Sequence, residues 1–167
     1  MAIRFRASPY PRNSEPFKDL VDLIEAVTHP TLRDVEPVSD AIRTGFVENF
    51  SSESSEFGAW RPLAQSTVLE RASLGYGGRH PMLFRTGSYY RTFVNQGNPD
   101  HVREFFSGAA GWTLSEGSQD YRADVHEFGT GEIPARPVTS LTNPQIDRIG
   151  DALEEMIDTI ERRARNA

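Results

Sequence analysis

The first half of the chain contains two segments whose apolar residues recur with helical spacing. In residues 14–29, apolar side chains follow an i, i+3, i+4, i+7 pattern and acidic residues lie opposite them, which predicts an amphipathic helix. Residues 37–50 repeat this pattern and predict a second helix. Before them, residues 1–13 alternate apolar and basic side chains and contain two prolines, so we expect an N-terminal arm there.

The middle of the chain is rich in residues that favour loops. Residues 51–58 are mostly serine, glutamate and glycine, which predicts a long mobile loop. Weaker helical patterns follow over residues 65–74 and 83–94, and the glycine-rich residues 75–78 separate them. We therefore expect two short helices joined by irregular chain.

Patterns typical of β-strands come next. Residues 102–106, continued over 112–114, predict one strand, and residues 121–128 predict a second. The polar residues 115–120 between them suit the turn of an antiparallel hairpin. Residues 138–141 predict a short edge strand.

A last helix closes the chain. Residues 142–144 provide a helix start signal, and apolar residues recur at helical spacing over 146–160. The order of elements predicts an α+β fold, in which an antiparallel β-sheet packs against several α-helices, with a long mobile loop and an N-terminal arm. We expect residues 14–167 to form a single domain.

The composition narrows the class of protein. The chain has 167 residues, which is a common size for one domain. It has no cysteine, which excludes disulfides and cysteine-based zinc sites. It also has no apolar run of the roughly 20 residues that a membrane span requires. We therefore expect a protein that is made in the cytoplasm and does not enter a membrane.

Charge is distributed unevenly along the chain. The net charge is −6, which argues against free nucleic-acid binding as the main role. Residues 57–103 nevertheless hold six basic and two acidic residues, whereas residues 14–56 hold three basic and ten acidic ones. These blocks fit either the solvated faces of a monomer or an assembly. In an assembly, arginine-bearing loops of one subunit would meet acidic helices of the next.

No pattern of catalytic or metal-binding residues stands out. The four histidines are scattered, and none has a second histidine at the spacing of a metal site. His126 and Glu127 begin a zinc-protease motif, but Thr130 occupies the position of its second histidine. No serine lies in a nucleophile elbow, and no glycine-rich loop carries the lysine of a phosphate-binding loop. We therefore expect no catalytic, metal or cofactor site, and we do not expect an enzyme.

Aromatic residues and arginines alternate through the middle of the chain. The aromatic residues are Phe57, Trp60, Tyr76, Phe84, Tyr89 and Tyr90, and the arginines are Arg61, Arg71, Arg79, Arg85 and Arg91. Such a set could stack on single-stranded nucleic acid, and protein interfaces are enriched in the same residue types. Because the whole chain is acidic, we favour a protein interface, with a nucleic-acid-binding module as the alternative.

Three short motifs, in this order, resemble a known family. They are Trp60-Arg-Pro-Leu63 followed by Thr67, then Leu83-Phe-Arg-Thr-Gly87, and then His126-Glu-Phe-Gly129 followed by Ile133-Pro-Ala-Arg-Pro137. The set is similar to the phage virion morphogenesis family, also called tail completion proteins, of the Mu-like and P2-like tailed phages. The resemblance covers about residues 60–137, and the last helix extends it toward the end of the chain.

The resemblance implies a structural protein of the virion neck. Copies would form a homo-oligomeric ring, expected to be a hexamer, at the head-proximal end of the tail. The ring would join tail and capsid and contact neighbouring neck, tail terminator or tail tube proteins. Genomic DNA would pass through its lumen without specific binding. Such a protein would be assembled in the host cytoplasm and would have no catalytic activity.

The resemblance also suggests roles for individual residues. Gly87 would allow close backbone approach, Gly129 would turn the chain out of a strand, and the prolines around Arg136 would hold that side chain outward. Trp60 and Leu63 would be packing anchors. The predicted interface residues are Trp60, Arg61, Arg79, Arg85, Gly87, Tyr89, His126, Gly129 and Arg136.

Overall fold

The computed structural model describes residues 24–108 and 111–165. The predicted N-terminal arm and most of the first predicted helix lie outside these residues, although residues 24–28 are helical. The helices are α2 (Glu36–Ser52), α3 (Gln65–Ser73), α4 (Ser88–Val94), α5 (Arg122–Phe128) and α6 (Asn143–Arg165). The strands are β1 (Ser54–Ser55), β2 (Gly58–Ala59), β3 (His101–Gly108) and β4 (Gly111–Ser118).

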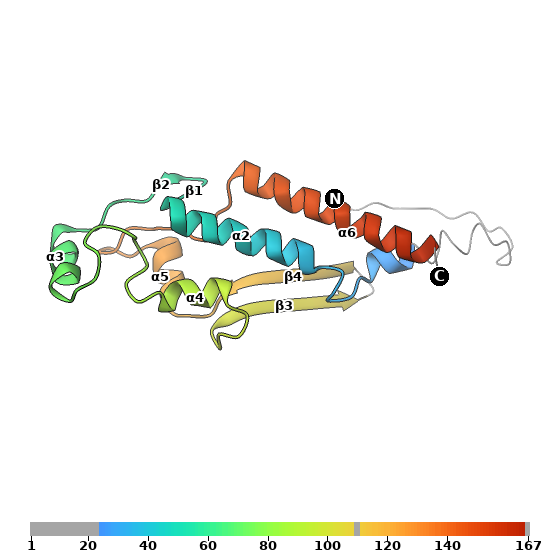
Figure 1. Ribbon diagram of the computed structural model, residues 1–167, viewed down its shortest axis with the longest axis horizontal. Coiled ribbons are helices and arrows are strands. Elements are labelled where there is room, and N and C mark those ends of the chain that lie inside the picture. Colours follow the sequence, from blue (N-terminus) through green and yellow to red (C-terminus); the bar gives the residue numbers. More distant parts are fainter. Residues whose placement is uncertain (1–23, 109–110, 166–167) are drawn as a thin grey trace, which may run out of the picture.

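The molecule is elongated and α2 runs through its centre (Figure 1). The long helix α6 lies along one side of α2, and the β3–β4 hairpin lies on the other side next to α4. The short helix α3 lies at the end of the molecule away from the hairpin's β3–β4 turn. The predicted α+β fold is confirmed, but the strands form two separate two-stranded antiparallel sheets.

The long hairpin lies at a different place in the sequence from the predicted one. Strands β3 and β4 pair directly, with His101 opposite Ser118 and Phe105 opposite Leu114. The single strand that we predicted over residues 102–106 and 112–114 is therefore divided, since 102–106 belong to β3 and 112–114 belong to β4. This register puts Phe105, Leu114 and Trp112 on one face, because partners across an antiparallel pair share a face.

The predicted strand over residues 121–128 is wrong, because these residues form helix α5. Tyr121 is the N-cap residue of this helix, and the Oδ1 of Asp120, one residue earlier, accepts a hydrogen bond of 2.9 Å from the backbone N–H of Arg122. A carboxylate in this position satisfies one of the free donors of a helix start. Tyr121 and Phe128, which suggested a strand, are both exposed.

Two other segments differ from their predicted structure. Much of the predicted mobile loop over residues 51–58 has regular structure, because α2 extends to Ser52 and β1 pairs with β2. Residues 138–141 form no strand. Instead, the Asn49 side-chain amide of α2 donates hydrogen bonds to the carbonyls of Val138, at 2.8 Å, and Ser140, at 3.2 Å. These bonds hold the segment against α2.

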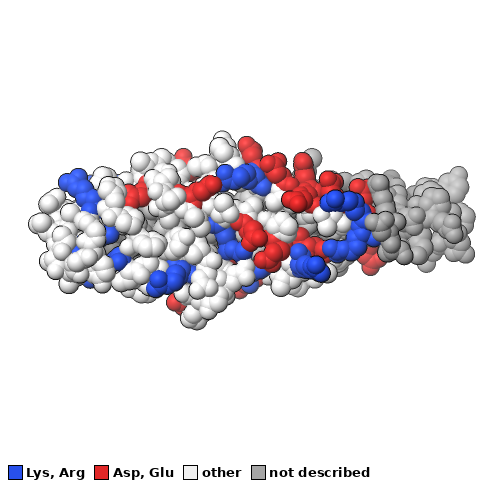
Figure 2. Space-filling view, viewed as in Figure 1, with Lys and Arg blue, Asp and Glu red and all other residues white. Residues whose placement is uncertain are grey.

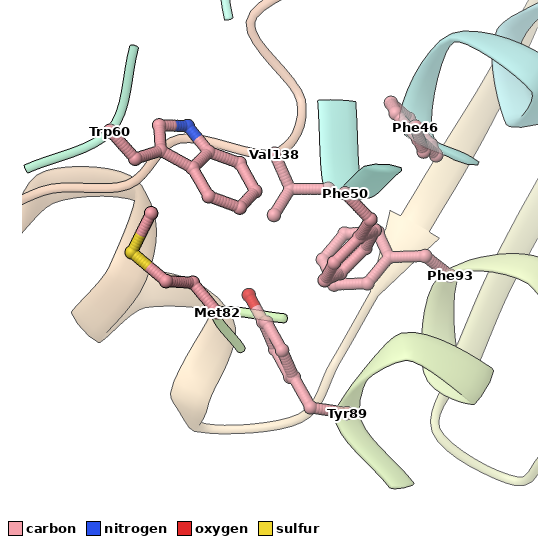
Figure 3. Packing of buried hydrophobic residues seen from close by; sticks show 7 residues of the cluster. All are labelled: Phe46, Phe50, Trp60, Met82, Tyr89, Phe93 and Val138. Atoms are coloured by element: carbon pink, nitrogen blue, oxygen red, sulfur yellow. The ribbon is translucent and has the colours of Figure 1, made fainter. Parts of the chain in front are cut away.

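The core consists of two apolar clusters. The first contains Phe46, Phe50, Trp60, Met82, Tyr89, Phe93 and Val138, and Figure 3 shows these side chains converging from α2, α4 and the connecting segments. Phe50 is its centre, with edge-on ring contacts to Trp60 and Phe93 among others. The second contains Val35, Val38, Met156 and Ile160, and the inward face of the hairpin packs against it.

A buried charge cluster joins α2 to the hairpin. The Glu116 side chain of β4 is fully buried, and Arg43 of α2 and Arg103 of β3 each lie 3.5 Å from its Oε1. His101 lies 3.3 Å from its other oxygen. If the hairpin moved on α2, the buried carboxylate of Glu116 would lose these partners, at a large cost in folding free energy. The cluster therefore fixes the position of the hairpin on α2.

Candidate functional site

Four of the predicted interface residues line one pocket. Arg85, Gly87, Tyr89 and His126 meet in a cavity of about 190 Å³ between α3, the segment before α4, and α5. Two further arginines, Arg71 and Arg122, line the same cavity. We call this cavity the arginine pocket and define it by Arg71, Arg85, Arg122, Tyr89 and His126.

Arg71 enters the arginine pocket from α3 and is only 5% exposed. Its Nη2 donates a 2.9 Å hydrogen bond to the carbonyl of Pro81. Its Nε has no hydrogen-bond partner among the described residues, and Arg71 forms no ion pair with any of them. A buried guanidinium with a free donor is unusual, because burying an unsatisfied charged group is costly.

The other two arginines of the pocket have acidic partners. Arg122 forms a forked pair with Asp120, and the hydrogen bonds from Arg122 lower the pKa of that carboxyl group. The guanidinium also lies over the Tyr89 ring, 5.3 Å from its centroid. Arg85 lies 3.5 Å from Glu70 in a pair that is open to solvent. The pocket therefore contains three guanidinium groups but only one carboxylate in its lining, that of Glu70.

His126 lines the pocket from α5. The pKa of His126 is lowered to about 4, chiefly by burial of the ring and then by the positive charges of Arg136 and Arg122, while Asp120 opposes them. The imidazole is therefore neutral at pH 7. Its ring packs 5.3 Å from that of Tyr89, and its Nδ1 is buried with no hydrogen-bond partner among the described residues.

The prediction that Arg136 points outward is wrong. Arg136 is 4% exposed. Its Nε donates to the carbonyl of Arg61 at 3.0 Å, and its Nη2 donates to that of Pro62 at 3.3 Å. The adjoining Pro137 carbonyl accepts a 3.2 Å hydrogen bond from the Trp60 indole. Arg136 is therefore a structural link between two segments of the chain.

The two glycines have the backbone conformations that their motifs suggested, with two corrections. Gly87 has a φ of 72°, and a Cβ there would lie 3.1 Å from the Arg91 Nη1 and 3.3 Å from the Phe84 ring, so the atoms near it belong to side chains and not to the backbone. Gly129 also has a φ of 72°, and a Cβ there would lie 2.7 Å from the backbone nitrogen of Ala135. Gly129 turns the chain out of helix α5, however, and not out of a strand.

The remaining predicted interface residues do not line the pocket, whereas Leu63, predicted as a packing anchor, does. Trp60 is a buried packing anchor, as expected, and Leu63 packs against the same cluster. Arg61 and Arg79 are exposed. Arg79 lines a separate depression beside Glu53 and His80.

The sequence did not predict that Arg71 and Arg122 line the pocket and add two of its three guanidinium groups. Arg71 was only one of several arginines in the middle of the chain, and Arg122 follows what was read as the start of a strand. Sequence reasoning also missed Glu127, whose two carboxylate oxygens accept hydrogen bonds from the backbone and side chains of residues 138–140. From the sequence alone, these three charged residues cannot be told apart from charged residues that lie on a solvated surface.

Two searches of the described residues bear on other functions. Residues 24–108 and 111–165 contain no group of three or more histidine, cysteine or acidic side chains placed to hold a metal ion. No helix in the same ranges has the length and apolar character to cross a membrane.

Comparisons of the chain with family models, with curated proteins and with solved structures found no match. The resemblance to tail completion proteins therefore depends on the short motifs and their order. The class of protein must be argued from the charge, shape and exposed surface of this molecule.

Proposed function

We propose that this chain is a structural virion protein of the phage neck, whose copies assemble head-to-tail into a ring. The observation that carries the proposal is the separation of charge between two parts of one elongated molecule. Each copy would present an arginine-bearing end to the acidic helix of its neighbour. A contact between two different faces repeats around a ring when its rotation closes.

The charge separation is visible along two segments. Between Ala59 and Val94 the chain holds five arginines and one acidic residue. Between Ile149 and Glu161, on α6, it holds five acidic residues and no basic one. Figure 2 shows few acidic side chains at the α3 end, whereas acidic side chains gather, with arginines among them, over the region where α2 and α6 lie. Such complementary patches set register and suppress wrong pairings.

Exposed apolar side chains are the second line of support. Phe57 is 76% exposed, Leu69 of α3 is 61% exposed, and Leu74, the C-cap residue of α3, is 51% exposed. Phe128, at the end of α5, is 79% exposed. A single exposed apolar residue needs no explanation, and we take this group of large ones as surface that a neighbouring copy would cover.

In the proposed ring, the copies surround the DNA channel at the head-proximal end of the tail. The motif resemblance suggests six copies, with tail terminator, tail tube or other neck proteins above and below. The net charge of −6 would prevent the ring from gripping the phosphates of DNA that passes through it. The chain would then act as a connector without catalysis.

The alternative, a nucleic-acid-binding module, has less support. Its stacking surface would need the aromatic residues of the middle segment to be accessible. Trp60 and Tyr89, which belong to that set, are 5% and 4% exposed. We therefore favour assembly through protein contacts.

Charge reversal in two complementary variants tests the proposal. One variant carries Arg61→Glu and Arg79→Glu, and the other carries Glu154→Arg and Glu155→Arg; all four residues are exposed. Each variant alone would place like charges across the contact and would sediment as a monomer under conditions in which the wild type forms a ring. An equimolar mixture would restore opposite charges at every contact and form rings again.

A control variant separates this effect from a change in overall charge. Glu104→Arg with Glu132→Arg reverses two exposed acidic residues outside the proposed contact, and it should assemble like the wild type. A wild-type chain that stays monomeric at every concentration, and also with tail tubes present, would overturn the proposal. So would a mixture that assembles no better than either variant alone.

A further inference from the structure

The arginine pocket differs from the rest of the arginine-bearing surface because it is concave and partly closed. Its volume of about 190 Å³ exceeds the roughly 30 Å³ that one water molecule occupies in the liquid. It therefore has room for a small polar group together with hydration water. The walls come from α3, α4 and α5, so the pocket does not depend on a single loop.

Two residues that line this pocket from different helices each have a buried nitrogen without a hydrogen-bond partner among the described residues. Arg71, on α3, is 95% buried and its Nε–H has no acceptor among the described residues. His126, on α5, has a buried Nδ1 that likewise lacks a partner in the described part of the chain. Buried donors are nearly always satisfied in native proteins. Arg71 therefore has an N–H donor that no described residue satisfies, and the Nδ1 of His126 is a second such donor or an acceptor, according to the tautomer of the ring.

The positive charge of the pocket favours an acceptor that is negatively charged. Arg122 is matched by Asp120 and Arg85 lies near Glu70, so of the three arginines that line the pocket Arg71 is the one without an ion pair in the described part of the chain. The neutral imidazole of His126 has one N–H to donate, and it adds no charge of its own. Guanidinium groups bind carboxylate and phosphate oxygens with two parallel hydrogen bonds.

We propose that the arginine pocket is a binding site for a single small oxyanion, a carboxylate or phosphate group. In this site the Arg71 guanidinium provides a positive charge that no carboxylate of the described residues matches, Arg85 provides a second charge at the exposed rim, and the neutral His126 ring lines the α5 wall. Arg122, held by Asp120 and Ser88, keeps the α5 side of the pocket in place. The site is independent of the proposed function, because a monomer contains all of it.

Titration of the full-length monomer with inorganic phosphate and with acetate, at constant ionic strength, tests this site. The readouts are the NMR signals of the His126 ring and of the arginine Nε–H groups. The expected result is a saturable shift of the Arg71 and His126 signals with at least one of the two anions. The anion that binds more tightly identifies the preferred chemistry.

Three variants locate the binding. Arg85→Gln removes an exposed charge at the rim and should weaken binding about tenfold, as the loss of one charge-assisted hydrogen bond does. Arg71→Lys keeps the buried positive charge but removes the Nε donor, and it should weaken binding by a similar factor. Arg79→Gln, an exposed arginine outside the pocket, is the matched control and should bind like the wild type.

The source of the oxyanion is tested separately. If the group is a side-chain carboxylate of a second copy, saturating phosphate will lower self-association of the wild type. If it is a free anion, self-association will not change. Both outcomes support the pocket, and only the first also depends on the proposed function. No saturable shift with either anion, or equal weakening in all three variants, would overturn the proposal.

Discussion

The guanidinium of Arg136 donates from Nε to the backbone carbonyl of Arg61 at 3.0 Å, across 75 positions of sequence. Together with the bond to Pro62, this contact joins the segment after β2 to the segment after α5. Burial and the nearby Arg61 lower the pKa of Arg136. The side chain therefore belongs to the framework behind the arginine pocket.

Arg136→Glu should destabilise the fold. A carboxylate at this position would face two carbonyl oxygens in a buried site, and neither oxygen can donate a hydrogen bond to it. Breaking a buried charged contact in this way costs about 3–5 kcal/mol. Urea unfolding followed by tryptophan fluorescence measures the change. Arg79→Glu, at an exposed position, should change the free energy of unfolding by no more than about 0.5 kcal/mol; equal stability of the two variants would contradict the assignment.

Phe93→Ala should be among the most destabilising substitutions in the first cluster. Phe93 is 1% exposed, and its ring makes edge-on contacts with Phe46, Phe50 and Tyr89 at centroid distances of 5.2–5.6 Å. Truncation of a buried phenylalanine typically costs about 3–5 kcal/mol because it leaves a cavity. Thermal unfolding of this variant is compared with that of Phe106→Ala, whose ring is 67% exposed. A similar loss in both would show that α4 is not packed as described.

The helices that have a continuous apolar stripe could be predicted from the sequence. Helices α2 and α6 were predicted within a few residues because each buries one face along its length. Helix α5 was not, since none of its residues is fully buried and its apolar side chains give no helical period. The hairpin turn was misplaced because glycines can interrupt a strand or end it, and only pairing in three dimensions distinguishes the two.

The candidate site was predicted less well than the fold, for a physical reason. The motifs located Arg85, Gly87, Tyr89 and His126, which the fold does bring together. The burial of Arg71 and Arg136 depends on carbonyl groups of Pro81 and Arg61. Any residue type supplies a backbone carbonyl, so these partners leave no trace in the sequence.

Gly129→Ala should destabilise the turn that follows α5. Gly129 has φ and ψ of 72° and 178°, a region that is nearly exclusive to glycine. A methyl group there would also lie 2.7 Å from the backbone nitrogen of Ala135. The backbone strain alone should cost about 1–3 kcal/mol. Gly131→Ala is the control, because no atom lies within 4 Å of its added Cβ; if chemical denaturation gives both variants the same midpoint, the constraint at Gly129 is not real.

His126 should make the stability of the fold depend on pH below neutrality. Its pKa is lowered from 6.5 to about 4 in the folded protein, so between these values the unfolded chain binds more protons than the folded one. Stability therefore increases with pH across this window, and it falls as the pH drops from about 6.5 toward 4. His126→Gln removes the titrating group and should flatten this part of the stability profile.

Unfolding midpoints in urea, measured at intervals from pH 7 to pH 4, check this effect. His29→Gln is the matched control, because His29 is an exposed histidine away from the arginine pocket, and it should keep the wild-type slope. The largest cause of the lowered pKa is burial of the ring, followed by the charges of Arg136 and Arg122. An oxyanion in the pocket would offset these charges and raise the pKa of His126. Added phosphate should therefore reduce the slope in the wild type, while His126→Gln, which has no such slope, should show no change of slope with phosphate.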